Sequence, residues 1–294
     1  APGVRGPRLR AREAVSTVLP GKISGDDIAI PAGKHYLYEN TRGQRSKKTT
    51  AQYSHASPQA NQNHLTMKSL QDTFKLSNGV EIPCVGFGTF RTPNGEVAVR
   101  AVKEAIAAGY RHIDTAAVYG NERSVGAAIR ESGIDRKDIF ITSKLWNSDQ
   151  GFDSTLRAFD KTMQALGTDY LDLYLIHWPI AKGHDGDWDK MNCETWRAME
   201  RLCLEGRIRS IGVSNFKVRH LTRLIEQADI VPMVNQIELH PGLNQDETVS
   251  YCKEQHILVE AWGPLAQGKI FGNAEMQAIA DRYGKNIAQI ALRW

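Results

Sequence analysis

Short apolar runs of six to eight residues alternate with amphipathic segments along the chain from residue 84 onward. The intervening segments place apolar residues at helical spacing. Near-continuous apolar strands separated by helices indicate a parallel sheet whose outer face the helices cover. Seven such units without a linker favour an eight-stranded α/β barrel over an open doubly wound sheet. The predicted strands are CVGFGT (84–89), RHIDTA (111–116), IFITSKL (139–145), LDLYLIHW (171–178), IRSIGVS (208–214), MVNQIEL (233–239) and ILVEAW (257–262).

Two further features complete the fold prediction. Segment 73–83 is typical of a β-hairpin that turns at Asn78-Gly79 and caps the barrel floor. Seven strands precede the last helical pattern, which runs from Ile287 to Trp294. Because such barrels need about 250 residues, we expect a (β/α)8 TIM barrel that is incomplete at its C-terminus by one strand–helix unit.

The first 66 residues differ in character from the rest. They lack sustained periodicity and are rich in Gly, Pro, Ser, Arg, Gln and Asn. Such a segment buries too little apolar surface to offset its ordering entropy. We therefore predict that 1–66 is a disordered or non-native extension and that the barrel domain is 67–294, starting at the first methionine, Met67. An Arg-rich transit peptide is the alternative.

Charge and composition exclude several classes of function. Residues 1–66 carry ten Lys/Arg and four Asp/Glu, whereas the remainder carries 27 and 29. The barrel therefore lacks the excess of positive charge that is typical of nucleic-acid-binding domains. No apolar run is long enough to cross a bilayer, so we expect no membrane partner. The four cysteines are scattered without metal or redox spacing, which is typical of reduced thiols. We expect a cytoplasmic monomer.

Ionisable side chains follow three successive strands. Asp114 and Tyr119 follow the strand at 111–116, Lys144 ends the strand at 139–145, and His177 ends the strand at 171–178. Parallel strands of a barrel converge at one face, where barrel enzymes have their active sites. A nearby ammonium favours the phenolate form of a tyrosine, so Lys144 would lower the pKa of Tyr119. Together these groups predict a proton-transfer site.

Each of these residues alone has a structural alternative. Asp114 and Lys144 could form an ion pair that only supports the fold, and Tyr119 could be packing. His177, before Trp178-Pro179, could be a core histidine with satisfied hydrogen bonds. The predicted convergence of all four at one barrel face favours catalysis.

Competing motifs are absent or incomplete. Gly86-x-Gly88 lacks the third glycine of a dinucleotide-binding fingerprint, and no Walker A or G-x-S-x-G motif occurs. His177, His184 and His240 lie on different segments without ligand spacing, so we expect no metal. By elimination, an acid built around tyrosine suits carbonyl reduction with hydride from a nicotinamide.

At these residues the chain resembles the aldo-keto reductase superfamily. Segment 109–126, GYRHIDTAAVYGNERSVG, is similar to the first family signature, and RSIGVSNF (209–216) is similar to the second. SKLW (143–146), LIHWP (175–179) and VNQIELHP (234–241) match as well. The resemblance runs from about residue 73 to 294. It implies a barrel that binds NADPH in an extended form without a Rossmann fold.

The resemblance also implies roles for individual residues. Tyr119 would be the general acid, Lys144 with Asp114 would lower its pKa, and His177 would orient the substrate carbonyl. Residues implied to bind the cofactor are Thr89, Phe90, Asp114, Ser214, Asn215, Gln236, Trp262, Gly263, Pro264, Leu265, Gln267 and Gly268. Among them, Ser214, Asn215 and Gln236 would hold the carboxamide, and Trp262 would stack on the nicotinamide unless it is ordinary packing. In the family, the 2′-phosphate site follows the LRW motif at 292–294, so the expectation of NADPH comes from the resemblance.

Local details suggest a subfamily. The combination of GFGTF (86–90) and AWGPLAQGK (261–269) is closer to bacterial 2,5-diketo-D-gluconate reductases than to animal members. The implied substrate pocket is lined by Phe90, Val118, Trp146, His177 and Trp178. We expect NADPH-dependent reduction of aldehydes and ketones, with 2,5-diketo-D-gluconate or a related dicarbonyl as substrate. The alternatives are a nicotinamide-binding regulatory or structural protein and an inactive truncated fragment.

Overall fold

The structure is a computed structural model that describes residues 69–294, so the prediction made for 1–66 lies outside the described residues. The strands are β1 (Thr73–Lys75), β2 (Glu81–Pro83), β3 (Phe87–Gly88), β4 (His112–Asp114), β5 (Phe140–Leu145), β6 (Leu171–Ile176), β7 (Ile208–Ser214), β8 (Val234–Glu238) and β9 (Leu258–Trp262). The α-helices are α1 (Glu96–Ala107), α2 (Glu122–Glu131), α3 (Phe152–Leu166), α4 (Trp188–Leu204), α5 (Val218–Ile225), α6 (Asp246–Glu254), α7 (Ala274–Arg282) and α8 (Ile287–Arg293). The 3₁₀ helices are η1 (Ala117–Tyr119), η2 (Arg136–Asp138), η3 (Asn147–Asp149) and η4 (Ala266–Gly272).

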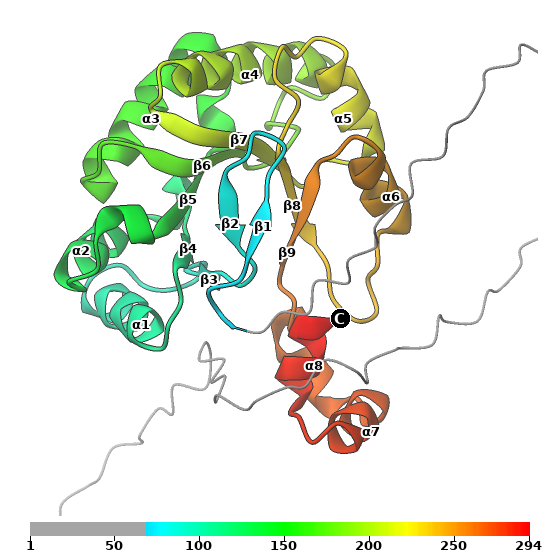
Figure 1. Cartoon of the computed structure of the whole chain (residues 1–294). Helices are drawn as coiled ribbons and strands as arrows, with labels where there is room; N and C mark the ends of the chain where they lie inside the picture. Colours follow the sequence, from blue (N-terminus) through cyan, green and yellow to red (C-terminus); the bar gives the residue numbers. More distant parts are fainter. Residues whose placement is uncertain (1–68) are drawn as a thin grey trace, which may run out of the picture. The chain divides into compact units, whose positions relative to one another are not determined.

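Strands β3 to β9 form one parallel sheet in which each strand pairs with the next strand along the chain. The sheet curls, and α1 to α6 lie along its outer side (Figure 1). Parallel neighbours require crossover connections, and each of these helices supplies one. The prediction of seven parallel strands with covering helices and an N-terminal hairpin is confirmed within residues 69–294.

One predicted boundary differs from the structure. The first barrel strand is only Phe87–Gly88 rather than 84–89, because the amide of Cys84 donates to the carbonyl of Asp72 beside the hairpin, at 2.9 Å, instead of joining the sheet. Helix α4 begins at Trp188, so part of the segment that follows β6 is helical.

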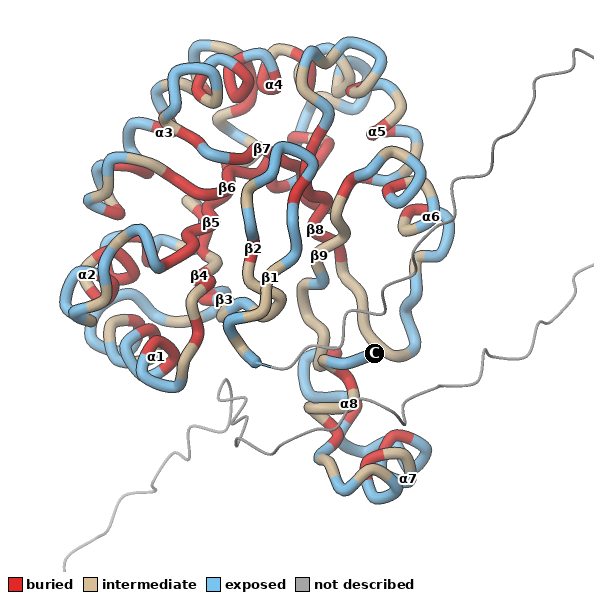
Figure 2. The backbone as a smooth tube through the Cα atoms, in the orientation of Figure 1, coloured by how far each residue is buried: buried red, intermediate tan, exposed pale blue. Residues whose placement is uncertain are grey.

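The core lies on both faces of the central strands. Every residue of β5 and β6 is buried, and Figure 2 shows buried positions concentrated on the strands and on the helix sides that face them. Burial on both faces explains why these strands read as continuous apolar runs. Trp196 of α4 is 1% exposed and Phe159 of α3 is 0% exposed, so aromatic rings fill the layer between helices and sheet.

The hairpin β1–β2 lies at the N-terminal ends of the strands. Its turn uses Gly79 in the left-handed region, with φ of 89°. The side chain of Asn78 donates to the carbonyl oxygen of Arg209, near the start of β7, at 2.8 Å. This end of the sheet also contains the buried Asp172, which accepts from Arg136 at 2.8 Å and from Arg209 at 2.7 Å. The N-terminal ends are therefore closed by structural contacts, which leaves the opposite ends for chemistry.

A smaller hydrophobic cluster follows β9. It joins Ala266 and Ile270 of η4 to Met276 and Ala280 of α7 and to Ile287 of α8. These elements pack on one another after the chain leaves the sheet, as the separate orange and red helices of Figure 1 show. The segment after Trp262 is therefore a folded unit rather than only a loop.

Candidate active site

Four ionisable side chains meet at the C-terminal ends of neighbouring strands. Asp114 is the last residue of β4, and Lys144 lies near the end of β5. His177 directly follows β6, and Tyr119 is the last residue of the short helix η1. The three strands are consecutive neighbours in the sheet, so the fold itself brings these groups together.

Lys144 and Asp114 form a buried ion pair. The ammonium nitrogen lies 2.5 Å from Oδ1 of Asp114, and the Lys144 side chain is 1% exposed. It also donates to the carbonyl oxygen of Thr115 at 3.0 Å. Burial alone would lower the pKa of Lys144, but the attraction of Asp114 and Tyr119 raises it overall. Lys144 therefore remains an ammonium at neutral pH.

Tyr119 faces this ammonium. The Lys144 nitrogen lies 5.2 Å from the centroid of the Tyr119 ring. Burial raises the pKa of Tyr119, whereas the charge of Lys144 and a hydrogen bond to it act in the opposite direction. Lys144 thus acts as predicted, but burial outweighs it, and the pKa of Tyr119 lies above its ordinary value. The phenol is consequently protonated at neutral pH, which is the form that can donate a proton.

His177 packs edge-to-face against two aromatic rings. Its ring centroid lies 5.7 Å from that of Tyr119 and 5.2 Å from that of Trp146. Burial, followed by the charge of Lys144, lowers the pKa of His177 to about 4, so the imidazole is neutral at neutral pH. Its Nδ1 is buried without a hydrogen-bond partner among residues 69–294. The alternative of a core histidine with satisfied hydrogen bonds therefore does not fit.

Apolar side chains surround these groups and remain accessible. Phe90 lies 5.1 Å from Tyr119 between ring centroids and is 63% exposed. Val118 and Trp178 are exposed by 43% and 42%. Exposed apolar groups around buried polar ones are typical of a site that takes small organic ligands.

The residues expected to hold a carboxamide lie at the ends of β7 and β8. Ser214 pairs with Gln236 across these strands, and its hydroxyl donates to the Gln236 carbonyl oxygen at 2.8 Å. Asn215 adopts a left-handed conformation, with φ of 65°, and donates to the His177 carbonyl oxygen at 2.9 Å. The side chain of Gln236 donates to Oδ2 of Asp114 at 2.8 Å. The amide groups are therefore continuous with the Asp114–Lys144 pair.

Trp262 ends β9 and is only partly buried. Its indole nitrogen donates to Oδ1 of Asn215 at 2.9 Å, which fixes the ring beside the amide groups. The following loop turns through left-handed conformations at Gly263, Gln267 and Gly268, with φ of 62°, 53° and 87°. Pro264 and Leu265, which lie within this loop, are partly buried.

A family model for the aldo/keto reductases matches residues 84–294. This chain belongs to the aldo/keto reductase family. A glyoxal reductase of Bacillus subtilis (strain 168) is 54% identical over 226 residues, which cover 77% of this chain and 79% of the relative. The chain is therefore an NAD(P)H-dependent oxidoreductase that reduces carbonyl groups.

Solved structures of family members share the fold. The crystal structure of an aldo/keto reductase from Brucella melitensis is 52% identical, with a TM-score of 0.71, over 76% of this chain and 83% of that chain. An aldo-keto reductase of Bombyx mori in complex with NADP is 38% identical, with a TM-score of 0.68, over 76% of this chain and 79% of that chain. The curled sheet of seven parallel strands thus corresponds to the TIM barrel of its family.

The residues at the ends of β7 to β9 fit a nicotinamide. A carboxamide needs both donors and acceptors, and Ser214, Asn215 and Gln236 supply hydroxyl and amide groups of both kinds. Trp262 presents a partly exposed ring beside them. Thr89 is 0% exposed, and its hydroxyl donates to the Asp114 carbonyl oxygen at 3.0 Å. Its place near the cofactor stays a prediction.

Sequence reasoning missed several supporting amides. Buried Asn121 donates to the carbonyl oxygens of Thr89 and Thr92, both at 3.0 Å, and so ties the loop after β3 to the segment that carries Tyr119. Gln150 donates to the Trp178 carbonyl oxygen at 2.8 Å. Asn121 lies two residues after Tyr119, within the signature segment 109–126. That position was the only feature of the sequence that pointed to a role for Asn121 in the site.

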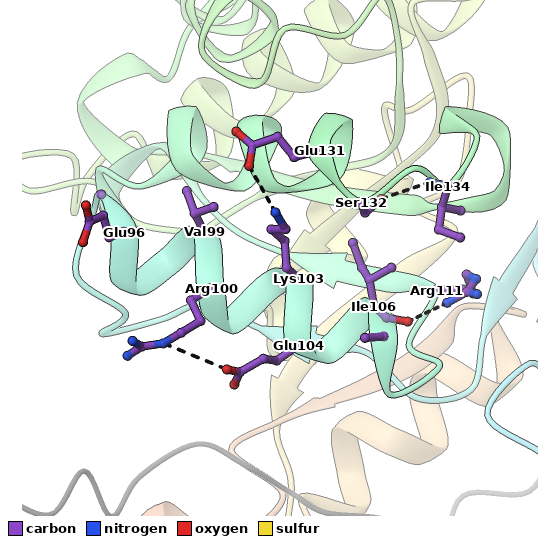
Figure 3. A pocket seen from close by; sticks show the side chains of 12 residues that line it. Glu96, Val99, Arg100, Lys103, Glu104, Ile106, Arg111, Glu131, Ser132 and Ile134 are labelled. Carbon is purple, nitrogen blue, oxygen red and sulfur yellow. Dashed lines mark hydrogen bonds and ion pairs between the residues drawn. The ribbon is translucent and has the colours of Figure 1, made fainter.

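A groove of about 970 Å³ lies elsewhere, between α1 and the end of α2 (Figure 3). Four of its charged side chains form ion pairs, since Lys103 lies 3.3 Å from Glu131 and Arg100 lies 4.0 Å from Glu104. No predicted site residue lines it. Among residues 69–294, no cluster of His, Cys, Asp and Glu could hold a metal ion, and no helix could span a membrane.

Proposed function

We propose that this reductase converts small aldehydes and ketones, dicarbonyl compounds above all, to alcohols, with NADPH as reductant and Tyr119 as proton donor. The observation that carries the proposal is the placement of the Tyr119 phenol over the buried Lys144–Asp114 pair. The NADP bound to the Bombyx mori relative supports the choice of NADPH.

Each residue of the site has its own role in the proposed reaction. When bound, the nicotinamide supplies a hydride to the carbonyl carbon. His177 is neutral, so one of its ring nitrogens carries a hydrogen that can be donated to the carbonyl oxygen and orient it. Tyr119 gives its proton to that oxygen, and Lys144 stabilises the phenolate that forms. Asp114 holds the ammonium in place. Ser214, Asn215 and Gln236 would hold the carboxamide, and Trp262 would stack on the ring.

The substrate proposal is a dicarbonyl. The sequence suggested 2,5-diketo-D-gluconate, whereas the Bacillus subtilis relative is a glyoxal reductase. Both names describe dicarbonyl compounds. The aromatic lining of Phe90, Trp146 and Trp178 offers few polar anchors, which favours acceptance of several carbonyl substrates. The monomeric state and the cytoplasmic location stay predictions from the sequence.

The test compares the native protein with Tyr119→Phe on a panel of glyoxal, methylglyoxal, 2,5-diketo-D-gluconate and simple aldehydes. Phenylalanine keeps the ring but removes the proton, so we expect kcat to fall by about 10²–10⁴. NADPH affinity, followed by tryptophan fluorescence, should stay nearly unchanged. A Tyr119→Phe protein that kept most of its activity would show that another group donates the proton. Saturable NADPH binding without turnover of any carbonyl would favour a regulatory role instead.

A further inference from the structure

A second polar cluster occupies the interior of the sheet next to the active site. It contains Glu260 of β9, His112 of β4 and Thr142 of β5. Nε2 of His112 lies 3.9 Å from Oε1 of Glu260 and 2.8 Å from Oγ1 of Thr142. The His112 side chain is 1% exposed and that of Glu260 is 21% exposed. Strand β9 is an end strand of the sheet and β4 is second from the other end, so this contact crosses the curled interior.

The packing around this cluster is tight. A methyl group added at Gly86 would lie 2.8 Å from Nδ1 of His112, so only glycine leaves room for the imidazole. Oε2 of Glu260 is buried and has no hydrogen-bond partner among residues 69–294. A buried carboxylate oxygen without a partner is costly, and such a group needs an explanation beyond packing.

Gln236 connects the cluster to the active site. It is the register partner of Glu260 on the adjacent strand, and its amide nitrogen donates to Asp114 at 2.8 Å. Burial raises the pKa of Glu260, and the neighbouring His112 and Gln236 oppose that increase. A side-chain amide nitrogen carries two hydrogens, so Gln236 can donate one to Asp114 and still has one that could be donated to Glu260.

Charge couples the two clusters as well. The ionisable groups that face Glu260 are His112 and Asp114 from β4 and Lys144 from β5. After Asp114 and Tyr119, Glu260 is a further cause of the raised pKa of Lys144. Two carboxylates therefore act on Lys144, that of Asp114 in direct contact and that of Glu260 on β9.

We propose that Glu260 is a positioning residue of the reductase, which holds Gln236 against Asp114 and thereby fixes the Asp114–Lys144 pair. The inference rests on the proposed function of Tyr119 and Lys144. It assigns a role to an interior carboxylate that does not touch the substrate. Its charge adjusts the alkaline pH at which the Tyr119–Lys144 unit stops donating a proton.

The experiment measures the pH dependence of kcat for Glu260→Gln beside the native enzyme. Glutamine keeps the shape and removes one negative charge, which eases proton loss from Tyr119 and Lys144 alike. The alkaline midpoint should therefore move to lower pH by at least about half a unit. Glu260→Asp keeps the charge and should restore the native midpoint. The matched control is Glu122→Gln, since Glu122 is a buried glutamate that accepts from Ser143 at 2.6 Å, and Ser143 lies on the opposite face of β5 from Lys144.

A second measurement works without substrate or cofactor. The ultraviolet absorbance of tyrosinate is titrated in each protein and in its Tyr119→Phe counterpart, and the difference reports Tyr119 alone. A downward shift in Glu260→Gln supports the proposal even if no carbonyl is reduced, in which case only the proposed function fails. Unchanged midpoints in both measurements would overturn the role of Glu260. Should the single variant not fold, Glu260→Met with His112→Leu removes the pair and carries the same expected shift.

Discussion

Replacing Lys144 by methionine tests how much the buried ammonium contributes to proton transfer. Methionine keeps the length and apolar character of the side chain and removes its charge. The ammonium lies 5.2 Å from the Tyr119 ring centroid. At an effective dielectric constant of about 20, this distance gives an attraction to a phenolate of about 3 kcal/mol. Because the phenolate forms only during proton transfer, this attraction lowers the barrier and not the ground state.

A loss of about 3 kcal/mol corresponds to a decrease in kcat of about 100-fold. The assay is loss of NADPH absorbance at saturating substrate, with NADPH affinity measured by tryptophan fluorescence. The variant also leaves Asp114 without its cation, so lower stability could imitate lower activity. The double variant Lys144→Met with Asp114→Asn removes that unpaired charge and serves as the control. If both variants fold and retain kcat within about tenfold, the electrostatic account of Lys144 is wrong.

Four further predictions concern other residues. The pKa of His177 is lowered to about 4, so its neutral form stabilises the fold above the unfolded pKa of about 6.5. This contribution is lost as pH falls toward 4. In urea titrations, the free energy of unfolding of His177→Leu should therefore decrease less steeply with falling pH than that of the native protein. For the same reason, kcat should show no inflection from His177 near neutral pH, and an inflection abolished by His177→Gln would contradict the lowered value. Asp172→Ala removes a buried carboxylate that accepts from two arginines. It should lower the free energy of unfolding, measured by urea denaturation, by about 3–5 kcal/mol. A decrease below about 1 kcal/mol would show that water hydrates the two guanidinium groups when the carboxylate is absent. Trp262→Ala should weaken NADPH binding by about tenfold through loss of stacking, whereas Trp178→Ala should not, and equal affinities would favour a packing role for Trp262.

The sequence predicted the sheet and the gathering of the four groups for one physical reason. Parallel strands run in the same direction, so residues that end consecutive apolar runs must meet at one edge. How deeply each of these side chains is buried depends on the packing of the whole molecule, and the residues next to it in the sequence do not predict it. Burial is what raises the pKa of Tyr119 above its ordinary value despite Lys144, and for that reason the predicted decrease does not occur.

Contacts across the interior were also beyond the sequence reading. His112 and Glu260 lie on strands that are far apart along the chain and meet only because the sheet curls. Alternation along a strand carried part of this information, because His112 is two residues before Asp114 and Glu260 is two residues before Trp262. Each therefore shares a strand face with a predicted site residue. Strand parity gives the face, but only the register places one side chain beside another.

The raised pKa of Tyr119 is consistent with its role as a donor in reduction. At rest the site holds a neutral phenol, a neutral imidazole and a compensated Lys144–Asp114 pair, so no free negative charge faces the substrate. Negative charge on Tyr119 appears only as its proton moves to the carbonyl oxygen. The attraction of Lys144 is therefore realised in the transition state, where it accelerates the reaction instead of tightening substrate binding. A tyrosine that was already ionised would lack the proton that the alkoxide requires.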